Sequence, residues 1–153
     1  MDELTYKQKI ESEMKSALLN GEFHLYLQPK VNMITSKVYG AEALSRWIHP
    51  VDGLRGPISY IPLFEENGFI VDLDMYMFEQ LCILKQRWHK ERVEYASIPI
   101  SINMSRRHLF RDTFVEELVN LADKYGVLSN EIEIEITESV YLSDNTELIQ
   151  TVD

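Results

Sequence analysis

Cysteine is almost absent from this sequence of 153 residues, in which Cys82 is the only one. A disulfide within the chain is therefore impossible, and no Cys/His spacing typical of a zinc site exists. The four histidines are scattered and form no ligand pair. No apolar run approaches the ~18 residues of a membrane-spanning helix, and the first residues lack the apolar core of a signal peptide. We therefore expect a chain without a membrane segment, in a reducing cytoplasm.

Basic residues are also scarce, since 15 Lys and Arg face 25 Asp and Glu, for a formal net charge of −10. A nucleic-acid polymer or an anionic membrane surface needs a cationic face, so neither is an expected partner. A small anionic ligand stays compatible, because a few arginines or a metal ion can bind it locally. The hydrophobic content of 45% is enough to bury one core, for one domain or part of a larger one.

Hydrophobic periodicity and turn residues divide the chain into helices and strands. Thr113 and Glu116 form a capping-box pair that opens one helix, and Gly126 closes it. In chain order we expect a helix over 3–19, strands over 23–31 and 38–47, a loop over 49–57, a short helix over 59–67, a helix over 72–90, a strand within 95–105, the helix that begins at Thr113, a strand over 131–136 and a final helix capped by Ser143 or Asp144.

Strands that alternate with helices predict an α/β sheet. Four strands are expected, and two architectures are open at this point. One is a complete small open sheet. The other is the front part of a (β/α)8 barrel, which needs roughly 250 residues.

The strand over 131–136 alternates glutamate and isoleucine, so its glutamates share one face. An antiparallel strand with its acidic face in water would explain this pattern. The neighbouring strands suggest more, because Asn103 and Glu42 also lie near the C-terminal ends of strands. Glu42, Asn103 and Glu135 would then converge at one rim if the strands are adjacent and in register. Hard oxygen donors of this kind select Mg²⁺, Mn²⁺ or Ca²⁺ over zinc.

Three further polar residues lie beside these ligands in the sequence. Arg46 ends the strand of Glu42, where its guanidinium would suit a phosphate, although an isolated arginine commonly pairs with an acid on the surface. Gln28 ends the first strand and could bond a base or phosphate, or merely cap that strand. Glu138 follows the last strand, where it could cap a helix or loop or take a direct part in the site, and the sequence favours neither role. Cys82 lies within a strong helix and is expected to be a small core residue.

Five short motifs resemble, in the same order, those of the EAL domain, the cyclic-di-GMP phosphodiesterases of bacterial signalling. Together they cover essentially residues 3–153. The motifs are Gln28-Pro29, Glu42-Ala43-Leu44-Ser45-Arg46-Trp47, Pro57-Ile58-Ser59-Tyr60-Ile61-Pro62, Ser101-Ile102-Asn103-Met104-Ser105 and Glu135-Ile136-Thr137-Glu138-Ser139.

The resemblance implies a modified (β/α)8 barrel in which the first strand runs antiparallel to its neighbours. It implies that Glu42, Asn103 and Glu135 are ligands of a catalytic Mg²⁺ or Mn²⁺. It also implies that Gln28 and Arg46 contact the cyclic dinucleotide.

The implied reaction opens one phosphodiester of cyclic-di-GMP by water attack at a two-metal centre and gives linear pGpG. Glu138 would match a glutamate that steadies a later active-site loop, and would not be a ligand.

The sequence also departs from the family. The family's Asp-Asp-Phe-Gly loop, which supplies further metal ligands, has no counterpart within the 153 residues, and neither do its later lysine, glutamate and glutamine. The chain therefore resembles roughly the first three-fifths of the domain. We divide it into a connector helix over 1–20 and a truncated EAL domain over 21–153. Three ligands without the acidic pair should bind Mg²⁺ weakly, because Mg²⁺ loses its water reluctantly.

These inferences predict a fragment of a cyclic-di-GMP phosphodiesterase that is inactive as an isolated chain. Two alternatives remain: a non-catalytic EAL module that acts as a cyclic-di-GMP receptor or protein-interaction platform, and a structural fragment with no activity. Open sheet edges and apolar surface also predict a homodimer or higher oligomer. The first helix resembles a connector from an upstream signalling domain.

Overall fold

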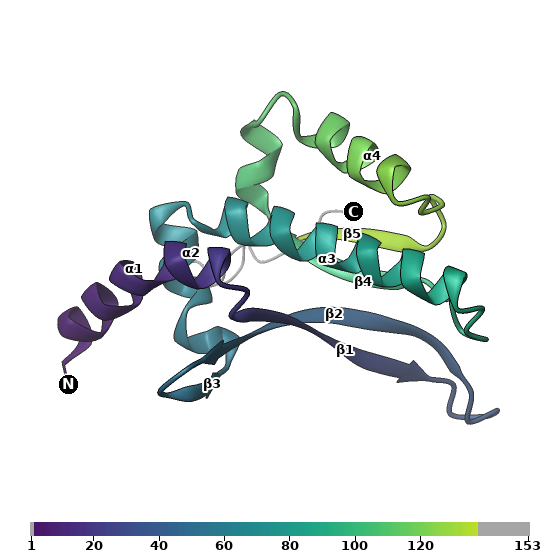
Figure 1. Ribbon diagram of the computed structural model, residues 1–153, viewed down its shortest axis with the longest axis horizontal. Coiled ribbons are helices and arrows are strands. Elements are labelled where there is room, and N and C mark those ends of the chain that lie inside the picture. Colours follow the sequence, from purple (N-terminus) through teal and green to yellow (C-terminus); the bar gives the residue numbers. More distant parts are fainter. Residues whose placement is uncertain (1, 138–153) are drawn as a thin grey trace.

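A mixed five-stranded sheet forms the centre of the molecule (Figure 1). The computed structural model describes residues 2–137. The main path of the sheet has the order β1-β2-β4-β5, and β3 pairs with β2 off this path. The strands are β1 (Phe23–Val31), β2 (Val38–His49), β3 (Gly53–Arg55), β4 (Ile100–Ser105) and β5 (Ile132–Thr137).

Among the described residues, four α-helices pack on one face of this sheet, and in Figure 1 α3 runs along the strands while α4 lies beyond it. Asp2 caps the first helix by accepting a 2.8 Å hydrogen bond from the Thr5 amide. Gly68 ends the second in the left-handed conformation, at φ +88°. The helices are α1 (Glu3–Leu19), α2 (Ile61–Asn67), α3 (Ile70–Lys90) and α4 (Phe114–Lys124), with short 3₁₀ turns η1 (Pro57–Ser59) and η2 (Arg106–Phe110).

Strand direction follows the predicted barrel pattern. β1 is antiparallel to β2, whereas β2 is parallel to β4 and β4 is parallel to β5. β2 and β4 approach closely where they begin to pair, because a Cβ at Gly40 would lie 2.9 Å from the Pro99 carbonyl oxygen. Only glycine fits there, and the next residue, Ala41, donates its amide to that same carbonyl.

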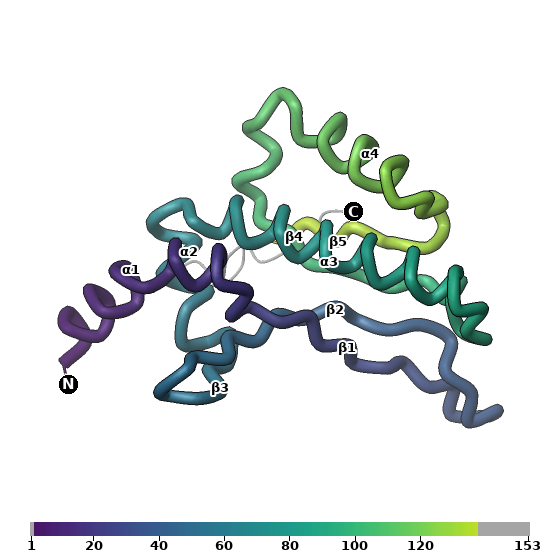
Figure 2. The backbone as a smooth tube through the Cα atoms, viewed as in Figure 1, coloured from purple at the N-terminus to yellow at the C-terminus, as the bar shows by residue number. Residues whose placement is uncertain are grey.

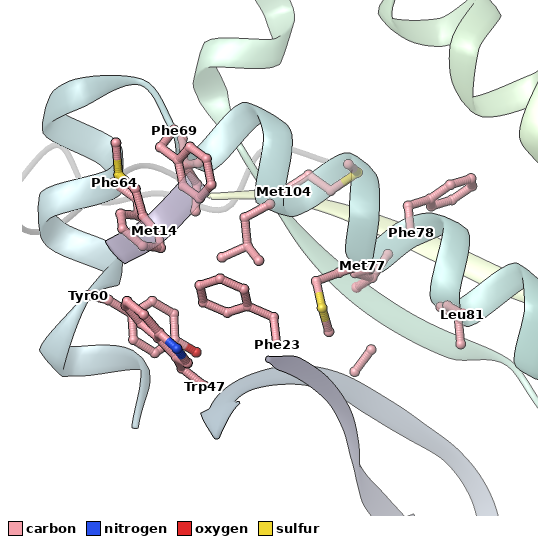
Figure 3. Close-up of a cluster of buried hydrophobic side chains, with 14 of the residues drawn as sticks. Met14, Phe23, Trp47, Tyr60, Phe64, Phe69, Met77, Phe78, Leu81 and Met104 are labelled. Atoms are coloured by element: carbon pink, nitrogen blue, oxygen red, sulfur yellow. The ribbon is translucent and has the colours of Figure 1, made fainter. Parts of the chain in front are cut away.

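The helices cover one face of the sheet, and the core fills the space between them. Strand residues such as Ala43, Ile102 and Met104 are buried there against Leu73 and Met77 of α3. Figure 3 shows the aromatic end of this core, where Phe23, Trp47, Tyr60, Phe64 and Phe69 cluster. Since side chains alternate along a strand, the other face carries the remaining residues of β1, β2, β4 and β5.

Helix α1 packs into the same core through Ile10, Met14 and Ala17. It runs toward one end of the long axis of the molecule, and the turn of the β1–β2 hairpin lies at the other end (Figure 2). Ion pairs join α1 to the β2–β3 hairpin, from Lys9 to Asp52 in its turn at 2.9 Å and from Glu13 to Arg55 in β3 at 3.1 Å.

Several predicted boundaries were wrong in detail. The loop over 49–57 contains β3, whose three residues between turns gave no periodic signal. The predicted helix over 59–67 divides into η1 and α2, and α3 begins two residues before 72. The predicted final helix lies outside the described residues.

The predicted capping box was also wrong. Thr113 stands at the N-cap of α4, but its side chain makes no capping bond to a backbone amide. Its hydroxyl donates instead to the carboxylate of Glu117, at 2.6 Å. Glu117 also receives the Arg111 guanidinium, at 3.0 Å.

Over residues 2–137, no helix has the length and apolar character needed to cross a bilayer.

Candidate functional site

The predicted site residues share the face of the sheet that the helices leave uncovered. Gln28 is opposite Glu42 in the β1–β2 register, and Asn103 is opposite Glu135 in the β4–β5 register. Glu42 is opposite Ser101, which lies two residues before Asn103 and therefore on the same face. Glu42, Asn103 and Glu135 therefore lie on one face of three neighbouring strands. The expected position of Glu42 near the end of its strand was wrong, because β2 continues for seven residues beyond it, to His49.

Glu42 and Asn103 are in direct contact. The Asn103 side-chain nitrogen Nδ2 donates to Glu42 Oε2 at 2.9 Å, and both residues are half-buried. Asn103 therefore reaches diagonally, by one pleat, from β4 to β2. Glu135 is also half-buried beside them, whereas Gln28 is exposed to solvent.

Arg46 lies four residues after Glu42, on the same face of β2. Its guanidinium donates to its own neighbour, the Ser45 carbonyl oxygen, at 2.8 Å, and lies 5.7 Å from the ring centre of Tyr26. Among residues 2–137 it forms no ion pair with a carboxylate, so the surface-pairing alternative does not apply. An arginine held by neutral groups keeps its charge available for an anion.

The backbone at Ser45 is fixed from the opposite face. The Ser45 hydroxyl and the Tyr60 hydroxyl lie 2.8 Å apart, and Tyr60 is fully buried. Burial raises the pKa of Tyr60 to about 12, so its hydroxyl stays protonated and hydrogen-bonded at neutral pH. Nothing in the sequence pairs these two residues, since 15 positions separate them.

A second polar group, which sequence reasoning missed, holds the end of β4. Asp74 of α3 accepts the Ser105 amide at 2.8 Å and hydrogen-bonds His108 at 3.0 Å. Glu65 of α2 lies beside this group with its Oε1 buried and without a hydrogen-bond partner. Burial raises the pKa of both Glu65 and Asp74. The sequence signal was an acid on an otherwise apolar helix stripe.

A cavity of about 360 Å³ lies between this acidic group and the strands, beside the hydrogen bond that joins Asp74 to Ser105. Ser45 and Asn103 line it from the sheet, and Glu65 and Asp74 line it from the helices. The cavity therefore adjoins the candidate site, because Asn103 belongs to both.

The donor set suits a hard cation in part. Within the described residues, no group of three or more His, Cys, Asp and Glu side chains is placed to hold a metal ion. The predicted set has two carboxylates and one amide, all of them oxygen donors, which is the chemistry of Mg²⁺ and Mn²⁺. Glu138, the remaining predicted residue, lies outside the described residues.

A family model described as the EAL domain matches residues 11–153. The chain belongs to the EAL domain family. Over 122 residues it is 32% identical to the cyclic di-GMP phosphodiesterase PA2567 of Pseudomonas aeruginosa, an alignment that covers 80% of this chain and 20% of that protein. Over 139 residues it is 27% identical to the oxygen sensor protein DosP of Escherichia coli, covering 91% of this chain and 17% of that protein.

Solved EAL structures match the fold. The EAL enzyme Bd1971, in its form bound to cAMP and cyclic-di-GMP, superposes with a TM-score of 0.75 at 28% identity, over 89% of this chain and 38% of that one. The PaMucR phosphodiesterase in complex with c-di-GMP gives 0.73 at 25% identity, over 82% and 50%. The expected fold class, an incomplete (β/α)8 barrel of EAL type with an antiparallel first strand, is confirmed. The EAL chain spans half or less of each of these four relatives.

Proposed function

We propose that this EAL chain forms the front part of a cyclic-di-GMP phosphodiesterase site, and that the 153-residue polypeptide alone binds the dinucleotide without hydrolysing it. The observation that carries the proposal is the contact between Glu42 and Asn103, with Gln28, Arg46 and Glu135 on the same face. Relatives that are named as cyclic-di-GMP phosphodiesterases, or that were solved with that ligand, support it.

Glu42, Asn103 and Glu135 would hold Mg²⁺ or Mn²⁺. Without a cation, two carboxylates brought to one rim repel each other, and the Asn103 amide relieves only one oxygen of Glu42. When bound, divalent ions acidify the attacking water and neutralise charge on the phosphoryl oxygens. We expect the affinity for Mg²⁺ to be low, because the chain supplies few ligands and Mg²⁺ retains its water.

Arg46 and Gln28 would contact the dinucleotide. The Arg46 guanidinium has room to exchange a weak neutral contact, the Ser45 carbonyl oxygen, for a phosphate oxygen. Gln28, which is exposed opposite Glu42, would bond a base or phosphate above the metal ligands. Glu138 would keep its role of steadying a later loop.

Calorimetry with cyclic-di-GMP tests this proposal, in the presence and absence of Mn²⁺. We expect metal-dependent binding that Glu42→Gln weakens at least tenfold and that the exposed control Glu66→Gln leaves unchanged. Tight binding that does not depend on metal would favour the receptor alternative. Metal-dependent release of pGpG by the purified chain would refute the claim that it is inactive alone.

The chain's partners follow from its edges and its first helix. β1 and β5 end the described path of the sheet, and next to β5 an apolar groove of about 240 Å³ lies between α3 and α4. We propose that a second copy covers this edge, giving a homodimer or higher oligomer. We also propose that α1, within a connector over 1–20, joins an upstream signalling domain in the parent protein. The free, buried Cys82 is compatible with the cytoplasmic location that such signalling requires.

A further inference from the structure

Tyr26 lies between the two residues that would contact the dinucleotide. Along β1, Gln28 is opposite Glu42, Tyr26 is opposite Leu44, and the next same-face pair joins His24 to Arg46. Side chains two residues apart on a strand share a face. Tyr26 therefore lies between the Gln28–Glu42 pair and the His24–Arg46 pair, two residues from each along β1. Its ring therefore borders the space between a bound metal and the phosphate that Arg46 would hold.

The tyrosine is not needed for packing. Its neighbours Leu25 and Leu27 pack against the hydrophobic core on the other face, whereas Tyr26 is 43% exposed and does not join that core. A tyrosine exposed in this way offers the flat apolar face of its ring to a ligand.

The charged partner of this ring is also the predicted phosphate ligand. The Arg46 guanidinium carbon lies over the Tyr26 ring, 5.7 Å from its centre. This distance is near the outer limit of a cation–π contact, so little free energy is lost when the arginine turns away. Once Arg46 turns to a phosphate, the ring face that it covers is open.

We propose that Tyr26 is the stacking surface for one purine base of the bound cyclic dinucleotide. The inference rests on the proposed function and extends it to a residue that contributes affinity without selecting the base. Stacking on an aromatic side chain tolerates any base, because every base has a π-face. Choice between guanine and adenine must then come from hydrogen-bonding groups elsewhere in the site.

Calorimetry on the 153-residue chain with Mn²⁺, using cyclic-di-GMP and cyclic-di-AMP as probes, tests this role. We expect Tyr26→Ala to weaken the binding of cyclic-di-GMP about 10- to 100-fold. The affinity for cyclic-di-AMP should fall by the same factor. Tyr26→Phe keeps the ring and should bind within about twofold of the wild type. The matched control is Tyr39→Ala, which removes an exposed tyrosine (57% exposed) elsewhere on β2. Thermal midpoints of the variants should agree, since none of these rings is buried.

Each other result overturns the inference. Wild-type affinity in Tyr26→Ala, with binding lost in Arg46→Ala, would refute stacking and leave the proposed function intact. Equal losses in Tyr26→Phe and Tyr26→Ala would assign the effect to the hydroxyl group. A loss confined to one probe would make Tyr26 a base-selecting residue instead. A wild-type chain that binds neither probe at millimolar concentration would overturn both this inference and the proposed function.

Discussion

At the scale of single residues, the side chain of Glu65 is buried next to the candidate site without a full set of hydrogen bonds. Glu65 is 5% exposed, and its Oε1 has no hydrogen-bond partner. Arg107 donates to the backbone carbonyl of this residue, at 2.7 Å, and its charge offsets the burial of the carboxylate only in part. A buried carboxylate left in this way costs stability whenever it is ionised.

We predict that Glu65→Gln stabilises the chain at pH 7 by about 1 kcal/mol, or a few degrees in Tm. Because burial raises the folded-state pKa of Glu65, its ionisation costs stability as the pH rises through that pKa. Below the unfolded-state pKa both states are protonated, so the gain should vanish near pH 4. Thermal melts of both proteins at pH 4 and pH 7 check this.

The control for this experiment is Glu66→Gln, which changes an exposed neighbour. It should move Tm little at either pH. A Glu65→Gln variant less stable than the wild type at pH 7 would mean that Glu65 makes a favourable charged contact.

At the scale of elements, a buried lysine joins α3 to the segments that precede β4 and β5. Lys85 is fully buried, donates to the carbonyl oxygens of Ala96 and Ile98, and lies 3.9 Å from Glu131. Glu131 is also buried and hydrogen-bonds His89 at 2.8 Å. These contacts hold the segments from which β4 and β5 start. They therefore help to fix the positions of Asn103 and Glu135 along those strands.

We predict that Lys85→Met destabilises the chain by about 3 kcal/mol, because it leaves the buried Glu131 with only His89 as a partner and deprives two carbonyl oxygens of their donor. Urea unfolding followed by circular dichroism measures the change. Lys90→Met, an exposed change five residues later on the same helix, should stay within about 0.5 kcal/mol. Equal effects of the two changes would contradict the assigned role of Lys85.

The elements also separate what sequence could predict from what it could not. Regular alternation predicted β5, and a long apolar stripe predicted α3, because each period is a property of neighbouring residues. The alternation also predicted that Glu135 and Ile136 lie on opposite faces of β5. The alternation misled at Glu131, which precedes β5 and is turned inward by Lys85.

For the candidate site, the sequence could predict only which residues of each strand share a face. Alternation placed Glu42 and Asn103 on one face each, but their 2.9 Å contact depends on the β2–β4 register, which no local pattern specifies. The Asp74–Ser105 bond was beyond sequence reasoning for the same reason, since it joins a helix to a strand 31 residues away. Tyr26 was overlooked because its role follows from the residues opposite it.

At the scale of the whole molecule, the edge at which β5 ends the described part of the sheet should control association. The groove there is lined by apolar residues, among them Val119, which is 50% exposed. We predict a dimer or higher oligomer at micromolar concentration, and Val119→Glu should shift it toward monomer by placing a charge in the contact. Light scattering coupled to size exclusion measures the mass.

The control for association is Val51→Glu, which alters an exposed residue in the β2–β3 turn, far along the chain from the groove. It should leave the mass unchanged. A monodisperse wild-type monomer at the same concentration would contradict the proposed self-association.

The central claim is that Glu42, Asn103 and Glu135 together hold a divalent cation on the open face of the sheet. Titration of Mn²⁺ into ¹⁵N-labelled chain tests it directly, because the ion broadens the NMR signals of nearby amides first. We predict that the amides of these three residues and of Arg46 broaden at the lowest Mn²⁺ concentration, and that Glu42→Gln abolishes this selectivity. Broadening that begins elsewhere on this acidic chain, with these amides unaffected, would contradict the account.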